Sequence, residues 1–140
     1  MNSDNSSGDT ANNNDSAPVG GPGAQVWKPL PPGHQSLTHK FEIGGHEGFI
    51  HVGIYDDGTP GQITVRFARE GSTISGLMDG LSKMVSTCLQ HGVPLQELSD
   101  QFIGMRFDPS GWTGNPDIPK ATSVVDYMFQ WLYRKFILRL

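Results

Sequence analysis

Cysteine is nearly absent from this 140-residue sequence, in which Cys88 stands alone. One cysteine cannot form a disulfide within the chain, so a disulfide framework and an all-cysteine zinc site are excluded. A reaction that draws two electrons from a pair of thiols is also beyond one cysteine. Cys88 falls on the apolar side of a predicted helix, which favours a small core side chain over a reactive thiol.

Long apolar runs and an excess of one charge are missing as well. No stretch approaches the roughly 18 apolar residues of a membrane-spanning helix, and the N-terminus lacks the basic start and apolar run of a signal peptide. We therefore expect a cytoplasmic protein with no membrane partner. Three of the fourteen acidic residues lie in the first 25 positions, which leaves eleven acids against ten bases in the rest. That near-balance argues against duplex DNA as a partner.

The N-terminal segment lacks the composition of a folded structure. Residues 1–25 contain no Lys, Arg or aromatic residue, and Asn, Ser, Gly, Asp and Pro dominate. Such a stretch cannot bury enough apolar surface to offset its ordering entropy, so we predict disorder. A linker rich in proline follows. The sequence therefore divides into a tail and linker, residues 1–35, and one folded domain, residues 36–140.

The first part of the domain has the alternating apolar and polar pattern of half-buried strands. Three such stretches lie around residues 41–43, 50–54 and 63–67, and glycine-rich turns separate them. Short turns of this kind join neighbouring antiparallel strands. The pattern predicts a small three-stranded antiparallel β-meander.

After Gly71 the apolar period changes to that of a helix. Apolar residues at helical spacing form one stripe between residues 74 and 89, which predicts a helix of about 18 residues capped by Gly92. A short second helix follows. A third is predicted over 124–137, where Ser123 and Asp126 resemble a capping box. The order of elements predicts an α+β domain with about three helices packed on one face of the sheet.

The stretch EGSTISGLMDGL, residues 70–81, allows two interpretations. Ser72 or Thr73 can cap the long helix, or the exposed helix start can bind a phosphate. The P-loop pattern GxxxxGK[ST] is absent. Gly76 and Gly80 each cost about 1 kcal/mol relative to alanine inside a helix, and close packing on the sheet would offset that cost.

The loop RFDPSGWTGNPDIP, residues 106–119, is a second candidate. Trp112 could stack on a base while Arg106 binds a phosphate. Alternatively, Arg106 pairs with Asp108 or Asp117, and Trp112 seals the edge of the sheet. Together the two stretches and one strand residue give a hypothetical nucleotide- or phosphate-binding set: Arg66, Gly71, Ser72, Thr73, Ser75, Gly76, Arg106, Ser110, Trp112 and Asn115.

Histidines of the first two strands form a third candidate cluster. A paired hairpin could place His39 and His51 on one outward face, with Glu47 near them. Their spacing matches no zinc pattern, so we predict no metal site. Together with Lys40 and Arg66, they could instead form a weakly basic face. No nucleophile and base stand in a catalytic arrangement, so we predict no catalytic residue.

Four stretches of the domain carry a family resemblance: LTHKFEIGGHEGFIHVGIYDDGTPGQI, EGSTISGLMDGL, HGVPLQEL and RFDPSGWTGNPDIPKATSVVDYMFQWL. In this order, over residues 36–137, they resemble the C-terminal part of adenosylcobalamin-dependent, class II ribonucleotide reductases, known as the TSCPD domain. The resemblance implies a ribonucleoside-diphosphate reductase with a large catalytic barrel. That barrel supplies a radical cysteine, a reducing cysteine pair and an acidic residue, and it binds adenosylcobalamin.

This chain departs from the reductases in its chemistry. It has no cysteine pair, and it ends in YRKFILRL where the family carries a further cysteine motif. We expect an accessory or nucleotide-binding module in the reduction of ribonucleotides to deoxyribonucleotides, inactive and free of cofactor by itself. A reductase catalytic subunit, a nucleotide, or a second copy bound through the basic and aromatic C-terminal helix would be its partner. A nucleotide or nucleic-acid binding module unrelated to reductases is the alternative.

Overall fold

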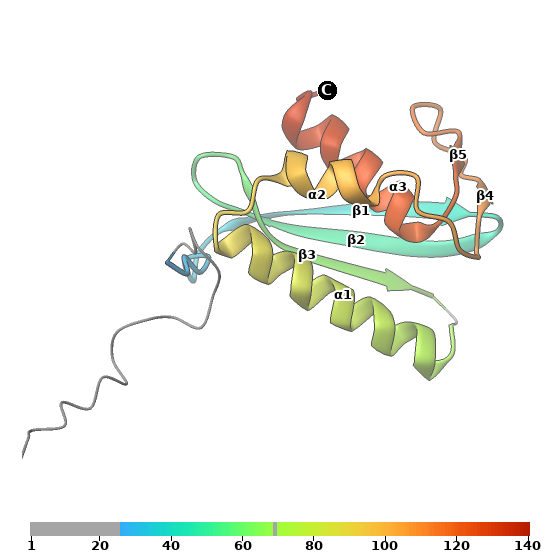
Figure 1. Ribbon diagram of the computed structural model, residues 1–140, viewed down its shortest axis with the longest axis horizontal. Coiled ribbons are helices and arrows are strands. Elements are labelled where there is room, and N and C mark those ends of the chain that lie inside the picture. Colours follow the sequence, from blue (N-terminus) through green and yellow to red (C-terminus); the bar gives the residue numbers. More distant parts are fainter. Residues whose placement is uncertain (1–25, 69) are drawn as a thin grey trace, which may run out of the picture.

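The computed structural model describes residues 26–68 and 70–140 and has the predicted α+β architecture (Figure 1). The predicted disorder of residues 1–25 lies outside the described residues. The elements are β1 (Gln35–Ile43), β2 (His46–Ile54), β3 (Pro60–Phe67), α1 (Ser72–Gln90), α2 (Leu95–Phe102), β4 (Gly111–Trp112), β5 (Lys120–Ala121), α3 (Val124–Leu132) and a π-helical turn η2 (Tyr133–Ile137).

The three long strands form the predicted antiparallel meander in the order β1-β2-β3. Gly44 and Gly45 make the first turn, with φ values of 55° and 86°. Two positive φ angles in a two-residue loop are the type I′ geometry, whose twist matches that of the strands. Alternate residues such as Phe41 and Ile50 are buried, while Thr38 and His51 on the other face stay exposed. One face of the sheet is therefore covered, as predicted.

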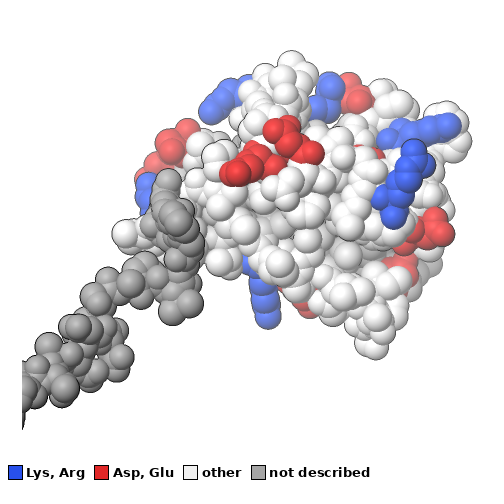
Figure 2. Space-filling view, viewed as in Figure 1, with Lys and Arg blue, Asp and Glu red and all other residues white. Residues whose placement is uncertain are grey.

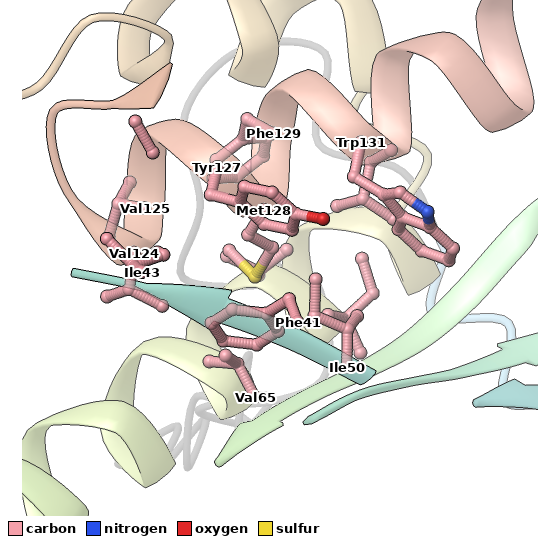
Figure 3. Packing of buried hydrophobic residues seen from close by; sticks show 14 of the residues in the cluster. Phe41, Ile43, Ile50, Val65, Val124, Val125, Tyr127, Met128, Phe129 and Trp131 are labelled. Atoms are coloured by element: carbon pink, nitrogen blue, oxygen red, sulfur yellow. The ribbon is translucent and has the colours of Figure 1, made fainter. Parts of the chain in front are cut away.

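Helix α3 provides most of that cover. The ring of Tyr127 stacks on Phe41 of β1 at a centroid distance of 5.0 Å, and Figure 3 shows Tyr127 and Met128 lying over the strand residues. On its other side, Phe129 stacks on Phe102 of α2 at 5.2 Å. Because nearly every residue of α3 is buried, this helix is the centre of the core.

Helix α1 runs along the outer edge of β3 (Figure 1). The Ser82 hydroxyl accepts the N–H of Val65 at 3.0 Å. One turn on, the Ser86 hydroxyl accepts the N–H of Ile63 at 2.9 Å and donates to its carbonyl at 3.0 Å. The Gln90 amide then donates to a further β3 carbonyl at 3.0 Å. These side chains satisfy backbone groups that an edge strand otherwise leaves unpaired.

This placement corrects two predictions about α1. Gly76 and Gly80 do not pack on the sheet, since a Cβ at either position would meet only open space. The buried stripe is also narrower than predicted, because Leu77 and Met84 are 64% and 69% exposed. The cause is that α1 faces the polar backbone edge of a strand, so that serines take up part of its buried side.

The start of α1 differs from the prediction, whereas its end agrees with it. The prediction that Ser72 or Thr73 caps the helix is wrong. The N-cap is Gly71 in an extended conformation, and no side chain caps the helix start. Because Ser72 is already the first helical residue, its hydroxyl lies past the capping position. Gly92 ends the helix with a φ of 84°, and its N–H donates to the Leu89 carbonyl at 3.0 Å, as predicted.

The described part of the linker lies against the domain. The indole of Trp27 donates to the Gln90 side chain at 2.7 Å, and the N–H of Lys28 donates to the Gln90 carbonyl at 2.9 Å. The Tyr55 hydroxyl donates to the Lys28 carbonyl. The domain boundary at residue 36 stays a prediction, although β1 already begins at Gln35.

The turn between β1 and β2 gives a stability prediction with an internal control. An alanine Cβ at Gly44 would lie 2.7 Å from the Ser110 carbonyl oxygen, whereas one at Gly45 would meet nothing within 4 Å. We expect Gly45→Ala to cost about 1–2 kcal/mol through its positive φ alone, and Gly44→Ala to cost more. Urea unfolding of both variants measures the difference. Equal losses would contradict the close approach of the Ser110 loop.

Candidate functional site

A cleft of about 610 Å³ lies between β1, the loop that precedes β5, and the α3–η2 segment. We call it the β1 cleft. Polar side chains from separate parts of the chain converge on it. Its lining consists of His39, Lys40, Phe41, Glu42, residues 113–118, Tyr127, Trp131, Arg134, Lys135 and Leu140.

Three polar side chains form a connected group in the cleft. The Tyr127 hydroxyl lies 2.8 Å from Nε2 of His39 and accepts a hydrogen bond from Nδ2 of Asn115 at 3.1 Å. All three groups are satisfied if Tyr127 donates its proton to Nε2, which leaves the imidazole proton on Nδ1. Asn115 is itself held, because its Oδ1 accepts the N–H of Asp117 at 3.0 Å.

His39 is held between two aromatic rings. Its imidazole stacks on Trp131 at a centroid distance of 4.7 Å and on Tyr127 at 5.9 Å. Burial, and then the positive charge of Lys135, lower the pKa of His39 below its ordinary 6.5. Burial raises the pKa of Tyr127 above 10.0, partly offset by the hydrogen bond from Asn115. Both groups are therefore neutral near pH 7.

The lowered pKa of His39 predicts how stability depends on pH. An unfolded histidine binds its proton more readily than folded His39 does, so this contribution to stability is present above about pH 6.5 and lost as the pH falls through that value. We expect His39→Gln to lose less stability than the parent chain between about pH 7.5 and about pH 5.5. Urea unfolding at both pH values measures this. An equal loss in the two proteins would contradict the assignment.

Charged side chains of both signs surround the cleft. Arg134 pairs with Asp117 at 3.6 Å, and Lys40 pairs with Glu47 at 3.5 Å. Within residues 26–68 and 70–140, Lys135 makes no ion pair. The charges in Figure 2 are likewise scattered, with no broad basic area on the face shown.

The cleft has the chemistry of a binding site. Its aromatic rings offer no free face to a nucleobase, because Tyr127 is fully buried and Trp131 is 8% exposed. Cys88 does not line it. Cavities of this volume suit drug-sized ligands, and a corrinoid is much larger, so the residues present do not fit adenosylcobalamin. The cleft can bind through hydrogen bonds and charge.

The predicted phosphate residues at the start of α1 fall on an exposed surface. Gly71, Ser72, Thr73 and Gly76 are exposed. Arg66 and Ser75 line a separate cavity of about 240 Å³, which they share with Asp79. The carboxylate of Glu70 is 2.8 Å from His46. The acidic side chains beside this helix start oppose an anion there.

The predicted loop residues fall in two further places. Arg106, Ser110 and Trp112 line a hollow of about 470 Å³, together with Lys120. The Lys120 ammonium lies 4.4 Å from the centre of the Trp112 ring, and Trp112 is 68% exposed, so it does not seal the sheet. Asn115 belongs to the β1 cleft. The ten predicted residues therefore do not form one site.

Two expectations, an ion pair of Arg106 and a shared face of His39 and His51, are wrong. Within the described residues Arg106 pairs with neither Asp108 nor Asp117, and Asp117 pairs with Arg134. His39 and His51 do not share a face, because His39 is the register partner of Ile50, whereas His51 is the partner of Thr38. His39 has the same parity along the strand as the buried Phe41, which is the signal that would have placed it inward.

In residues 26–68 and 70–140, no three His, Cys, Asp or Glu side chains are grouped so that they could hold a metal ion. No helix of that part of the chain combines the length and apolarity that a membrane crossing requires.

Comparison with known proteins agrees with the family resemblance of the sequence. Residues 25–136 match the TSCPD domain family, so the chain belongs to that family. Similar proteins are named vitamin B12-dependent ribonucleotide reductase. The one from Rhodopirellula baltica is 50% identical over 111 residues, which are 76% of this chain and 11% of the relative. Those from Streptomyces avermitilis and Streptantibioticus cattleyicolor are each 41% identical over 112 residues, or 80% of this chain.

The match covers little of those relatives. It spans 12% of the Streptomyces avermitilis protein and 19% of the Streptantibioticus cattleyicolor protein. No solved structure matches the chain significantly. The comparisons therefore relate this domain to a small part of a much longer reductase.

Proposed function

We propose that this chain is an accessory domain that acts with the catalytic part of a B12-dependent ribonucleotide reductase. The observation that carries the proposal is the identity of 50% to a segment that makes up 11% of such a reductase. A segment retained at this identity and folded around its own core is expected to keep the surfaces by which it contacts the rest of the enzyme. The proposed partner is therefore a reductase catalytic subunit, and the process is deoxyribonucleotide supply in the cytoplasm.

We further propose that the chain does not reduce ribonucleotides alone. The reaction consumes two electrons, and a dithiol that becomes a disulfide is the donor that the family resemblance implies. Cys88 is the only cysteine in the sequence and packs partly buried against the core. The isolated chain should give no deoxyribonucleotide when supplied with ribonucleotide, adenosylcobalamin and a dithiol.

Binding to a truncated reductase tests the proposal. The Rhodopirellula baltica relative, with the segment that matches this chain removed, is titrated with the chain in a calorimeter. We expect saturable binding, and we expect the untruncated relative to bind much less, because its own segment occupies the surface. Absence of binding to the truncated relative would contradict the accessory role.

Nucleotide binding is the second candidate, and the hollow beside Trp112 favours it. An exposed aromatic ring and two cations, Arg106 and Lys120, line it. The Asp108 carboxylate lines it too and accepts a hydrogen bond from the Ser110 hydroxyl at 3.2 Å. Stacking and charge of this kind suit one nucleotide. Titration of the amide NMR spectrum with ATP and dATP should shift residues 106–115, less so at high salt, and Trp112→Ala should abolish the shifts. Shifts that survive in the variant would contradict this site.

Self-association through the C-terminal helix stays a prediction. Trp131 is buried in the core and Phe136 packs against it. Leu138 and Leu140 are the large apolar residues that this end exposes among the described ones, while α1 exposes Leu77 and Met84. Sedimentation of the chain at increasing concentration measures the oligomeric state.

A further inference from the structure

The two edge strands of the sheet, β1 and β3, differ in what covers their outer edges. The outer edge of β3 is covered by α1, whose Ser82, Ser86 and Gln90 side chains bond to the strand's backbone. Within residues 26–68 and 70–140, no helix packs along β1 as α1 packs along β3, and part of the outer edge of β1 lines the β1 cleft. Proteins usually cover or disrupt a free edge, because unpaired backbone groups pair readily with another extended chain.

The hairpin geometry identifies the free groups of β1. A two-residue turn closes with Ile43 and His46 as a hydrogen-bonded pair, so odd-numbered residues of β1 bond to β2. The N–H and C=O groups of Thr38, Lys40 and Glu42 therefore point outward, away from β2. No hydrogen bond from elsewhere in the described residues reaches these groups; the next contact along this edge is the N–H of Gly44 with the Trp112 carbonyl.

From these observations we propose that the β1 cleft binds an extended, acidic peptide segment as an added strand on the edge of β1. The free groups of Lys40 and Glu42 supply backbone hydrogen bonds at strand spacing. Residues 39–42 span about 13 Å at the rise of an extended chain, which fits about four residues of such a segment. Side chains of the added strand that face inward meet Trp131, Arg134 and Lys135.

The charges of the cleft select the chemistry of that segment. Lys40 and Arg134 have carboxylate partners at 3.5 and 3.6 Å, and Lys135 has none within the described part of the chain. Glu42 also lines the cleft, but it has the strand parity of the exposed Thr38 and so lies on the outward face of the sheet. An acidic side chain facing inward would pair with Lys135, whereas a basic one would be repelled by it and by Arg134. The absence of a free aromatic face excludes nucleobase stacking as the main contact.

The source of the segment rests on the proposed function, since the reductase catalytic part is the partner proposed above. The mode of binding is independent of that source. Two probes therefore separate the two proposals: an acetylated peptide that alternates valine and glutamate, and the Rhodopirellula baltica reductase without its matching segment.

The test uses paired variants of one residue. Lys40→Pro removes an outward N–H without touching the pairing with β2, and proline is tolerated at such edge positions. Lys40→Gln removes only the charge. Thermal unfolding checks that both fold. We expect Lys40→Pro to weaken binding about tenfold, the effect of one lost backbone hydrogen bond, and Lys40→Gln to weaken it less than about threefold.

A second measurement leaves the protein unchanged. The valine and glutamate peptide is compared with a version in which every backbone nitrogen carries a methyl group, so that neither of its edges can donate a hydrogen bond to a strand. Amide NMR of the chain should show shifts at Lys40 and Glu42 with the first peptide and none with the second. Equal shifts with both peptides, or none at β1 with either, would overturn strand addition.

Hydrogen exchange of the chain, measured with and without the truncated reductase, distinguishes the strand proposal from the accessory role. Protection of the Thr38, Lys40 and Glu42 amides on binding supports both proposals. Binding with protection confined to α1 overturns the strand proposal and leaves the accessory role intact. No binding to the reductase, together with β1 shifts from the peptide, overturns the accessory role and leaves the strand proposal intact.

Discussion

Asp126→Ala should lower the free energy of unfolding by about 3 kcal/mol or more, because buried donors left without an acceptor each cost about 1–3 kcal/mol. The Asp126 side chain is 2% exposed. Its two oxygens accept the backbone N–H of Gly104 at 2.7 Å and that of Thr122 at 2.9 Å. The Gln130 amide adds bonds of 3.0 and 2.9 Å. This carboxylate ties the turn after α2 to the start of α3.

Urea unfolding measures the loss, and a surface aspartate provides the control. Asp100 on α2 is exposed and accepts one bond from Gln96 at 2.8 Å, so Asp100→Ala should stay within about 0.5 kcal/mol of the parent. Asp126→Asn keeps one acceptor oxygen and should fall between the two. If Asp126→Ala costs no more than Asp100→Ala, the buried network does not contribute as argued.

Removing both serine hydroxyls that face β3 is the second change with a large expected effect. Ser82→Ala with Ser86→Ala leaves the N–H groups of Val65 and Ile63 buried without a partner. We expect a loss of about 2–4 kcal/mol, from two unsatisfied donors partly offset by the better helix propensity of alanine. The weakened cover of the β3 edge should also promote aggregation at high concentration.

The matched control lies on the same helix. Ser72 is exposed and makes no capping bond, so Ser72→Ala should leave the free energy of unfolding unchanged within about 0.5 kcal/mol. Thermal unfolding and light scattering follow stability and aggregation in the same samples. A double variant as stable as the parent would show that α1 protects the edge by its apolar contacts alone.

The period of the apolar residues predicted most of the fold, because that period depends only on residues close together in the sequence. Strand and helix periods depend on neighbouring residues, so the three strands and the long helix were visible in the sequence. Contacts between residues that lie far apart in the sequence were not visible there. That Ser82 and Ser86 bond to a strand edge, and that Asp126 binds backbone groups in addition to sitting at a cap, depends on which elements meet in space.

The candidate site depends even more on contacts between residues that are far apart in the sequence. Asn115 was singled out from its loop, but its partners, His39 and Tyr127, lie far from it in sequence. The polar character of histidine favours an outward face for His39, and the strand register shows that this expectation is wrong. Strand parity with Phe41 places His39 on the inward face, but its stacking on Tyr127 and Trp131 depends on contacts between segments far apart in the sequence.

The most direct test of the accessory role is an activity measurement. The Rhodopirellula baltica reductase without its matching segment is assayed for deoxyribonucleotide formation, with adenosylcobalamin and a dithiol, in the presence and absence of this chain. The accessory role predicts that the chain raises the activity of the truncated enzyme in a saturable way and gives none alone. Activity that does not change at any concentration of the chain, whether or not the two bind, would contradict it.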